Sequence, residues 1–288
     1  MLRYLLPAAA FFMTAAAQPV PSPDDPYLWL EEIEGERALA QVREWNKETE
    51  DLLTASPRYE HYRARALSIL SDEQRIATPD NVMGDYVANH WTDAQNPRGL
   101  WRISPLDPYV AGKPEWRTLI DVDALGKQEG KSWVWHGANC LAPEYTRCLV
   151  SLSPGGTDAD VVREFDIQTG KFVEGVFTVP EAKSSIAWFD EDHLLVATDY
   201  GEGSLTTSGY PRIVKLWKRG TPLSAARTIF TGEPGDVSAT PFSTLDGDKR
   251  WTFVNRGKTF WTNELSLVTP EGTLVETPLP DTAHFRDV

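Results

Sequence analysis

Short runs of β-branched and aromatic residues fill the chain from about residue 85 onwards, and they constrain its fold more than any other feature. Gly, Pro, Asp and Asn separate the runs, as expected for strands joined by tight turns. The runs form four groups that recur about every 45 to 55 residues, the spacing typical of propeller blades. The predicted strands are 85–91, 99–104 and 116–122; 132–139, 147–152, 161–167 and 171–178; 186–189, 193–198, 212–217 and 227–230; 237–243, 250–255, 259–268 and 273–276. A generic all-β sandwich is the alternative.

The region before these strands has a helical period. From Gly35 onwards, apolar residues recur at spacings of three and four with charged residues among them, which predicts an amphipathic helix over 35–53. A second helix is expected from Pro57 to about Leu70. The chain is therefore mainly β, with an N-terminal helical arm at residues 18–80 and a partial propeller of about four blades at residues 81–288.

The first residues are expected to be a signal peptide rather than part of the fold. Arg3 supplies a positive charge, residues 5–13 are apolar, and three alanines precede Gln18. We predict a signal peptide over residues 1–17, cleaved after Ala17, and hence an exported protein, which in a Gram-negative bacterium would be periplasmic. No later stretch approaches the roughly 20 apolar residues of a membrane helix.

Composition excludes two classes of partner. Lys and Arg total 28 against 42 Asp and Glu, which gives a net charge of −14. Such a chain repels both a phosphate backbone and an anionic membrane surface, so neither nucleic acid nor membrane is an expected partner. Attraction of cationic peptides is compatible with this charge, although a solvated acidic surface is the simpler interpretation.

The two cysteines, Cys140 and Cys148, flank a stretch with Pro143 near its centre, which indicates a hairpin connection between two strands. Cross-strand positions of a hairpin lie within disulfide reach, and an exported protein meets an oxidising compartment. We predict a disulfide between them, with two unrelated buried thiols as the alternative.

A search for reacting groups finds no catalytic set. The Gly-x-Ser-x-Gly pattern of a nucleophile elbow does not occur, and Ser204, which directly follows Gly203, has the wrong spacing. Zinc-binding, dinucleotide and phosphate-loop patterns do not occur either, so we assign no catalytic, metal-binding or cofactor-binding residue. The five histidines are scattered and are expected to be structural or exposed: His61, His90, His136, His193 and His284.

Residues 25–31 (Asp-Pro-Tyr-Leu-Trp-Leu-Glu), here called the N-terminal aromatic segment, place Tyr27, Trp29 and Leu30 next to one another. Pro26 favours a turn or an extended arm over a helix. Three large apolar groups in four residues imply docking onto a surface, with a hydrophobic staple for the next helix as the alternative.

This segment resembles the N-terminal segment of prolyl oligopeptidase-type serine peptidases (peptidase family S9A). Two further matches follow in the correct order. Residues 153–166 look like the Gly- and Asp-containing inter-strand turn of the second blade, and residues 198–201 with 207–214 are similar to the third-blade insert of bacterial members. None of the three matches supplies a reacting group.

The resemblance implies a seven-bladed propeller inserted into an α/β-hydrolase domain that carries a Ser, Asp and His triad. It further implies hydrolysis of short peptides by the complete enzyme, without a cofactor. Only about four blades fit before Val288, so the hydrolase domain is expected to be absent and the chain alone to be inactive. Tyr27, Trp29 and Leu30 would then dock on that hydrolase domain. The alternative function is a non-catalytic propeller module that binds a peptide or protein partner.

A partial propeller has a physical consequence. Blades are stabilised by neighbours on both sides, so four blades leave two blade faces uncovered. We expect the isolated chain to be marginally stable, oligomeric or aggregation-prone. The rival explanation for the partial propeller is a sequence that ends before the complete gene does.

Overall fold

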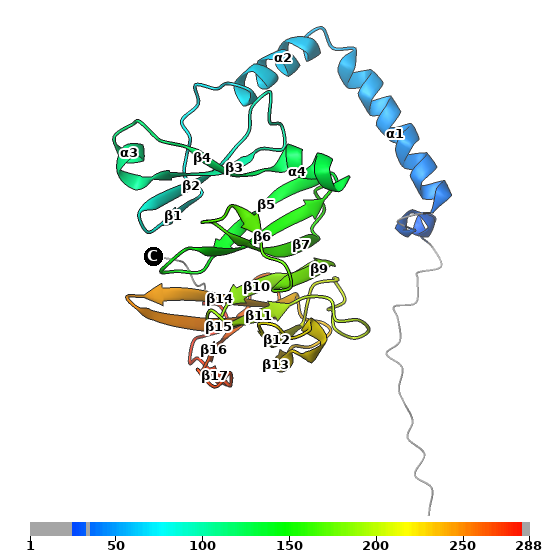
Figure 1. Ribbon diagram of the computed structural model, residues 1–288. Helices are drawn as coiled ribbons and strands as arrows, with labels where there is room; N and C mark the ends of the chain where they lie inside the picture. Colours follow the sequence, from blue (N-terminus) through cyan, green and yellow to red (C-terminus); the bar gives the residue numbers. More distant parts are fainter. Residues whose placement is uncertain (1–24, 33–34, 284–288) are drawn as a thin grey trace, which may run out of the picture. The chain divides into compact units, whose positions relative to one another are not determined.

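The computed structural model describes residues 25–32 and 35–283, which form two compact units divided between Ile69 and Leu70 (Figure 1). The first unit contains the N-terminal helices and the second contains the blades. Residues 70–80, which the sequence assigned to the arm, group with the second unit. The predicted signal peptide at residues 1–17 lies outside the described residues. No helix among the described residues is long and apolar enough to cross a membrane.

The N-terminal unit consists of a short 3₁₀ helix η1 (Leu28–Glu31) and two helices, α1 (Glu36–Thr54) and α2 (Tyr59–Leu70). A turn at Pro26 and Tyr27 precedes η1, and the backbone N–H of Tyr27 donates to Asp25 Oδ1 at 2.8 Å. The prediction of a turn or extended arm is therefore correct for the turn only. The fixed φ of Pro26 is also compatible with the start of a helix, and the residues after the turn form the 3₁₀ helix η1.

The amphipathic pattern of α1 does not produce a buried stripe. Ala38 is its one buried residue, whereas Trp45 is 45% exposed and Leu52 is 75% exposed. The helix is supported locally instead, by an ion pair at 2.6 Å between Lys47 and Asp51. The apolar face of α1 is thus available to another surface.

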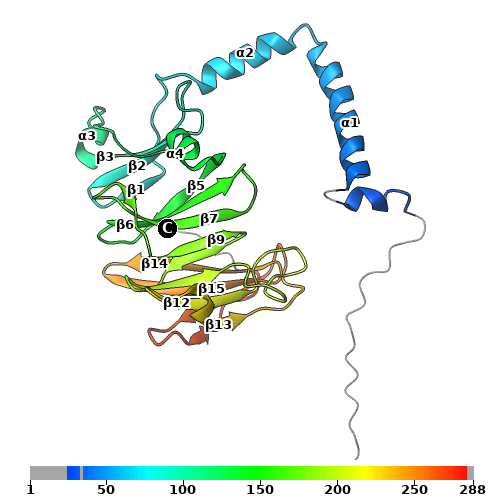
Figure 2. The same cartoon turned by 45° about the vertical axis from the view of Figure 1, so that its right-hand side comes forward.

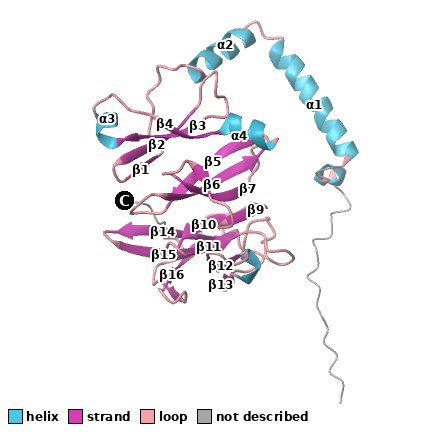
Figure 3. Ribbon diagram, viewed as in Figure 1, coloured by secondary structure: helices cyan, strands magenta, loops and turns pink. Residues whose placement is uncertain are grey.

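The second unit consists of four antiparallel sheets that follow one another in chain order, which confirms the predicted partial propeller (Figure 2 and Figure 3). The strands of blades 1 and 2 are β1 (Asn81–Met83), β2 (Tyr86–Trp91), β3 (Leu100–Pro105) and β4 (Arg117–Asp121), then β5 (Trp133–Cys140), β6 (Arg147–Pro154), β7 (Asp160–Asp166), β8 (Lys171–Phe172) and β9 (Thr178–Ala182). Those of blades 3 and 4 are β10 (Ser185–Trp188), β11 (His193–Ala197), β12 (Ile213–Lys218) and β13 (Arg227–Thr231), then β14 (Ser238–Asp246), β15 (Lys249–Gly257), β16 (Asn263–Val268) and β17 (Leu274–Glu276).

Blade 1 contains one strand and two helices that the sequence analysis missed. The strand is β1, and the helices are α3 (Leu106–Val110) and α4 (Val122–Glu129). Helix α4 has recognisable ends, because Asp121 accepts the backbone N–H of Ala124 at 2.8 Å and Gly130 has a φ of 64°. A third short helix, the 3₁₀ turn η2 (Leu223–Ala225), precedes β13.

The outer strand of blade 2 is interrupted. Both β8 and β9 pair with β7, β8 opposite its C-terminal half and β9 opposite its N-terminal half. Glu164 of β7 bonds to the backbone on both sides of the interruption, since its C=O accepts from Val173 and its N–H donates to Phe177. The single strand predicted over 171–178 is therefore two strands, separated by a loop that contains Gly175 at a φ of 69°.

Apolar clusters hold consecutive blades together. Blades 1 and 2 share a cluster built around Trp101, Trp133 and Phe165. Blades 2 and 3 share one that contains Trp188 and Trp217, while blades 3 and 4 meet around smaller residues such as Ala239. Because blade 3 packs against apolar clusters on both faces, its strand β11 is a nearly continuous apolar run over Leu194–Ala197.

Candidate functional site

Ser204, the serine nearest to a nucleophile pattern, has a structural environment. Its side chain is buried at 2% exposure, and its Oγ lies 2.6 Å from the C=O of Gly201 and 3.0 Å from Asp199 Oδ1. The same Oγ accepts the backbone N–H of Tyr200 at 2.9 Å. No histidine contacts it among the described residues, so the hydroxyl orders the loop after β11 and has no base to activate it.

The histidines of the blades are paired with groups other than a nucleophile. Nδ1 of His136 lies 2.6 Å from Asp160 Oδ1, Nδ1 of His193 lies 2.9 Å from Asp190 Oδ1, and Nε2 of His90 lies 3.1 Å from the C=O of Arg98. Burial raises the pKa of Asp160, although His136 opposes the shift. Within residues 25–32 and 35–283, no three His, Cys, Asp or Glu side chains are placed to hold a metal ion.

The predicted docking residues lie together at the start of the N-terminal unit. Tyr27 is 62% exposed, while Trp29 and Leu30 are half-buried. Trp29 is held in place, because its Nε1 donates to the C=O of Pro26 at 3.0 Å and the guanidinium of Arg37 lies 4.0 Å from its ring centroid. The aromatic segment therefore forms an ordered patch attached to α1.

The structure joins Cys140 and Cys148 by a disulfide. The two residues are directly opposite each other on β5 and β6, with a Cα–Cα separation of 3.9 Å. Both cysteines are buried in the cluster between blades 1 and 2. The bond closes the β5–β6 hairpin within this apolar cluster.

A buried charge cluster links blades 2 and 3, and sequence reasoning missed it. Glu164 of β7 is 0% exposed, yet its carboxylate contacts Arg147 Nη1 at 3.0 Å and Arg219 Nη1 at 2.8 Å. The available signal was strand periodicity, because Glu164 shares a strand face with the buried Val162. A carboxylate at such a position requires cationic partners from elsewhere in the fold.

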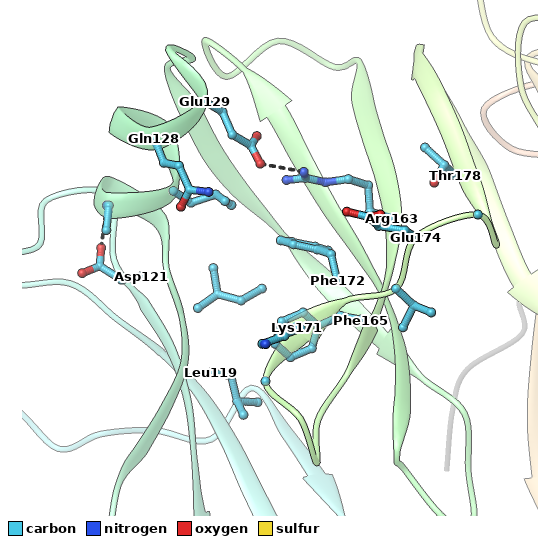
Figure 4. A pocket seen from close by; sticks show the side chains of 16 residues that line it. Leu119, Asp121, Gln128, Glu129, Arg163, Phe165, Lys171, Phe172, Glu174 and Thr178 are labelled. Carbon is cyan, nitrogen blue, oxygen red and sulfur yellow. Dashed lines mark hydrogen bonds and ion pairs between the residues drawn. The ribbon is translucent and has the colours of Figure 1, made fainter.

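A cleft of about 760 Å³ lies between β4 with α4 on one side and the interrupted outer strand of blade 2 on the other (Figure 4). Its lining combines an apolar floor with charged walls. The main lining side chains are Leu119, Leu125, Phe165 and Phe172, with Asp121, Gln128, Glu129, Arg163, Lys171, Glu174 and Thr178 around them.

The charges in this cleft are partly neutralised within the protein. Glu129 binds Arg163 Nη1 at 2.8 Å and accepts Nε1–H of Trp133 at 2.8 Å, while the Arg163 guanidinium lies 3.9 Å from the Phe172 ring centroid. The exposed Lys171 and Glu174 form no ion pair in the described part of the chain. Apolar side chains beside the exposed Lys171 and Glu174 can bind a short peptide, and no nucleophile and base converge among the residues that line this cleft.

Comparisons with known proteins identify the same architecture. Residues 18–273 match the family model described as "Prolyl oligopeptidase, N-terminal beta-propeller domain". An uncharacterized peptidase of Sinorhizobium fredii is 43% identical over 266 residues, covering 91% of this chain and 37% of the relative. An uncharacterized peptidase of Rickettsia prowazekii is 33% identical over 216 residues, covering 70% of this chain and 29% of the relative.

Solved structures give a consistent result. A post-proline cleaving enzyme from Rickettsia typhi superimposes with a TM-score of 0.79 at 28% identity, over 88% of this chain and 38% of that chain. Oligopeptidase B from Leishmania major shares the fold, with a TM-score of 0.58 at 17% identity over 90% of this chain and 35% of that chain. The present chain thus spans between 29% and 38% of the length of these four proteins.

Proposed function

We propose that this chain, which belongs to the prolyl oligopeptidase N-terminal β-propeller family, is the propeller part of a serine-type endopeptidase. The complete enzyme would hydrolyse short peptides. The observation that carries the proposal is the family match over residues 18–273. Both relatives compared above are named peptidases, in agreement with the proposal. The propeller would limit access to reacting groups located in another domain.

The described side chains support a division of labour. Ser204 orders a loop, and the blade histidines pair with carboxylates or a backbone carbonyl. We infer that the nucleophile, the base and the oxyanion donors come from an α/β-hydrolase domain, and that this chain alone does not cleave peptides. Peptide hydrolysis requires these groups within hydrogen-bond reach of one another.

The test uses two proteins and a short chromogenic peptide with proline before the cleaved bond, a choice suggested by the printed name of the Rickettsia typhi enzyme. The first protein is this chain alone, for which we expect no cleavage. The second is a chimera in which residues 18–288 replace the matching segment of the Sinorhizobium fredii peptidase, for which we expect cleavage that a serine-reactive fluorophosphonate abolishes. Serine-dependent cleavage by the chain alone, or a folded but inactive chimera, would contradict the proposal.

Export to the periplasm is part of the same proposal. It rests on the charged, apolar and small-residue pattern of residues 1–17 and on the disulfide between Cys140 and Cys148, which persists in oxidising compartments. N-terminal sequencing of the protein from a periplasmic extract should give Gln18 as the first residue. A chain that retains Met1 would refute the cleavage.

The alternative is a non-catalytic module, and the cleft between blades 1 and 2 is the observation that favours it. Its apolar floor with Lys171 and Glu174 at the mouth fits a short zwitterionic peptide. Titration of the chain with a di- or tripeptide library, followed by isothermal calorimetry, distinguishes the two functions. Binding that Lys171→Glu removes, together with an inactive chimera, would favour the module.

A further inference from the structure

Two adjacent aromatic side chains are almost fully exposed at the loop between β15 and β16. Phe260 is 85% exposed and Trp261 is 78% exposed. We call residues 258–262 the aromatic tip. Exposure of large aromatic side chains to water is unfavourable. Two such side chains next to each other on one turn are typical of an interaction site.

The aromatic tip is an ordered turn. The N–H groups of Lys258 and Thr259 both donate to the C=O of Thr262, at 3.0 and 3.2 Å. The hydroxyl of Thr259 accepts the N–H groups of Trp261 and Thr262, at 3.1 and 3.0 Å. The two aromatic side chains are therefore presented by a fixed backbone, which lowers the entropy lost when they bind.

An ion-pair network fixes the base of the tip. Lys258 Nζ lies 2.8 Å from Glu264 and 2.8 Å from Asp281, and Glu264 also contacts Arg256 Nη1 at 3.1 Å. Arg256 in turn binds Asp236 at 2.7 Å, in the connection between blades 3 and 4. Four elements of the chain thus hold in place a turn whose two aromatic side chains face solvent.

Blade topology identifies the end of the propeller at which the tip lies. A blade of four antiparallel strands returns the chain to the end where it started, so every connection between blades lies at one end. Helix α4 marks this end, because it connects β4 of blade 1 to β5 of blade 2, whereas α3 connects β3 to β4 and marks the opposite end (Figure 1). The β15–β16 loop connects the second and third strands of blade 4 and therefore lies at the α4 end.

A polypeptide that precedes or follows the blades is attached at the α4 end by the same reasoning. The relatives are much longer than this chain, which covers 37% of one and 38% of another. We propose that the aromatic tip, Phe260 with Trp261, docks the propeller onto the hydrolase domain of the complete enzyme; this inference rests on the proposed function. Trp and Phe at the centre of an interface bury roughly 150–250 Å² each, and Trp is enriched among hot spots.

The test compares the accessibility of one position in two proteins. Phe260→Cys is introduced into the isolated chain and into the chimera with the Sinorhizobium fredii peptidase, and labelling by a maleimide is followed by peptide mass spectrometry. We expect labelling of this thiol to be at least about tenfold slower in the chimera. Val110→Cys is the matched control, because Val110 is 75% exposed and lies in α3 at the opposite end.

A second variant keeps the test valid if the cysteine itself weakens docking. Phe260→Ser combined with Trp261→Ser should leave the propeller part of the chimera folded, since neither side chain is buried within the blades, and should separate the thermal unfolding of the chimera into two transitions. Equal labelling of Phe260→Cys in both proteins, or a single unchanged transition in the double variant, would overturn docking. Labelling is read whether or not the chimera is active, so absence of peptide cleavage counts against the proposed function separately.

Discussion

The two faces of blade 2 contact their neighbours by different means. The face towards blade 1 is apolar and aromatic, with Trp101 and Trp135 stacked at 5.2 Å between ring centroids and the disulfide beside them. The face towards blade 3 also has an apolar cluster but places the fully buried Glu164 beside it, between two arginines. The face towards blade 1 thus keeps its charged pair, Glu129 with Arg163, partly exposed beside the cleft, whereas the face towards blade 3 holds a fully buried carboxylate.

The difference teaches how stability and specificity are distributed between the blades. Apolar burial is non-directional, so it depends little on the orientation of any single contact. A buried carboxylate is favourable only when its cationic partners arrive in the correct place, and Arg147 and Arg219 come from blades 2 and 3 respectively. We therefore expect the first face to contribute more free energy and the second to be more sensitive to a single change of charge.

The largest effect is expected from Trp101→Ala on the apolar face. Trp101 is 2% exposed and also contacts Phe165, with ring centroids 5.6 Å apart. Its removal leaves a cavity between blades 1 and 2, which should reduce the free energy of unfolding by about 3–5 kcal/mol. Urea denaturation followed by circular dichroism measures this; a loss below about 1 kcal/mol would mean that the blades separate independently of the cluster.

The charged face is tested by Glu164→Ala. The substitution leaves two arginines facing each other without a carboxylate, and we expect a loss of about 3 kcal/mol, slightly less than for Trp101 because Arg147 and Arg219 keep some contact with water. Glu60→Ala is the matched control: Glu60 forms an exposed pair with Arg63 and should change stability by less than about 0.5 kcal/mol. If Glu164→Ala and Glu60→Ala lost the same free energy of unfolding, the buried charge cluster would contribute no more than an exposed ion pair, and the distinction between the faces would be removed.

Reduction of the disulfide should have a smaller effect. Cys140 and Cys148 are separated by eight positions, and closure of such a short loop restricts the unfolded chain by about 2–3 kcal/mol. Urea midpoints measured with and without a phosphine reductant give the difference, and the protein with Cys140→Ser and Cys148→Ser should match the reduced form. If reduction left the midpoint unchanged, the apolar face would owe its stability to packing alone.

The strands were predictable because their physics is local. Runs such as Leu194–Ala197 combine β-branched and apolar residues between turn signals, and the structure forms strands at these positions. Strand β1 was missed because Asn81–Met83 is too short to show a period. The split of β8 from β9 was missed because it depends on how Glu164 pairs with the backbone on both sides, a tertiary effect.

The binding surfaces were less predictable than the strands. Tyr27, Trp29 and Leu30 could be selected because three large apolar groups lie within four residues. Phe260 and Trp261 look like part of a strand in the sequence, and only the turn made by Thr259 and Thr262 exposes them. The cleft of Figure 4 could not be predicted at all, because its walls come from two different blades.

The smallest expected effect sharpens the comparison within β7 itself. Asp160 lies on the same strand as Glu164 but is paired with a histidine, and burial raises its pKa. A carboxyl with a raised pKa favours folding when protonated, so this contribution is present below about pH 3.8 and is lost as pH rises through the folded pKa. Asp160→Asn lacks that dependence, and its stability relative to the native protein should increase between pH 3 and pH 6.

Urea denaturation at pH 3 and pH 6 measures this relative stability. The control is Val150→Ala on the apolar face, which should lose the same free energy of unfolding at both pH values. A relative stability of Asp160→Asn that falls with pH would mean that His136 outweighs burial at this site.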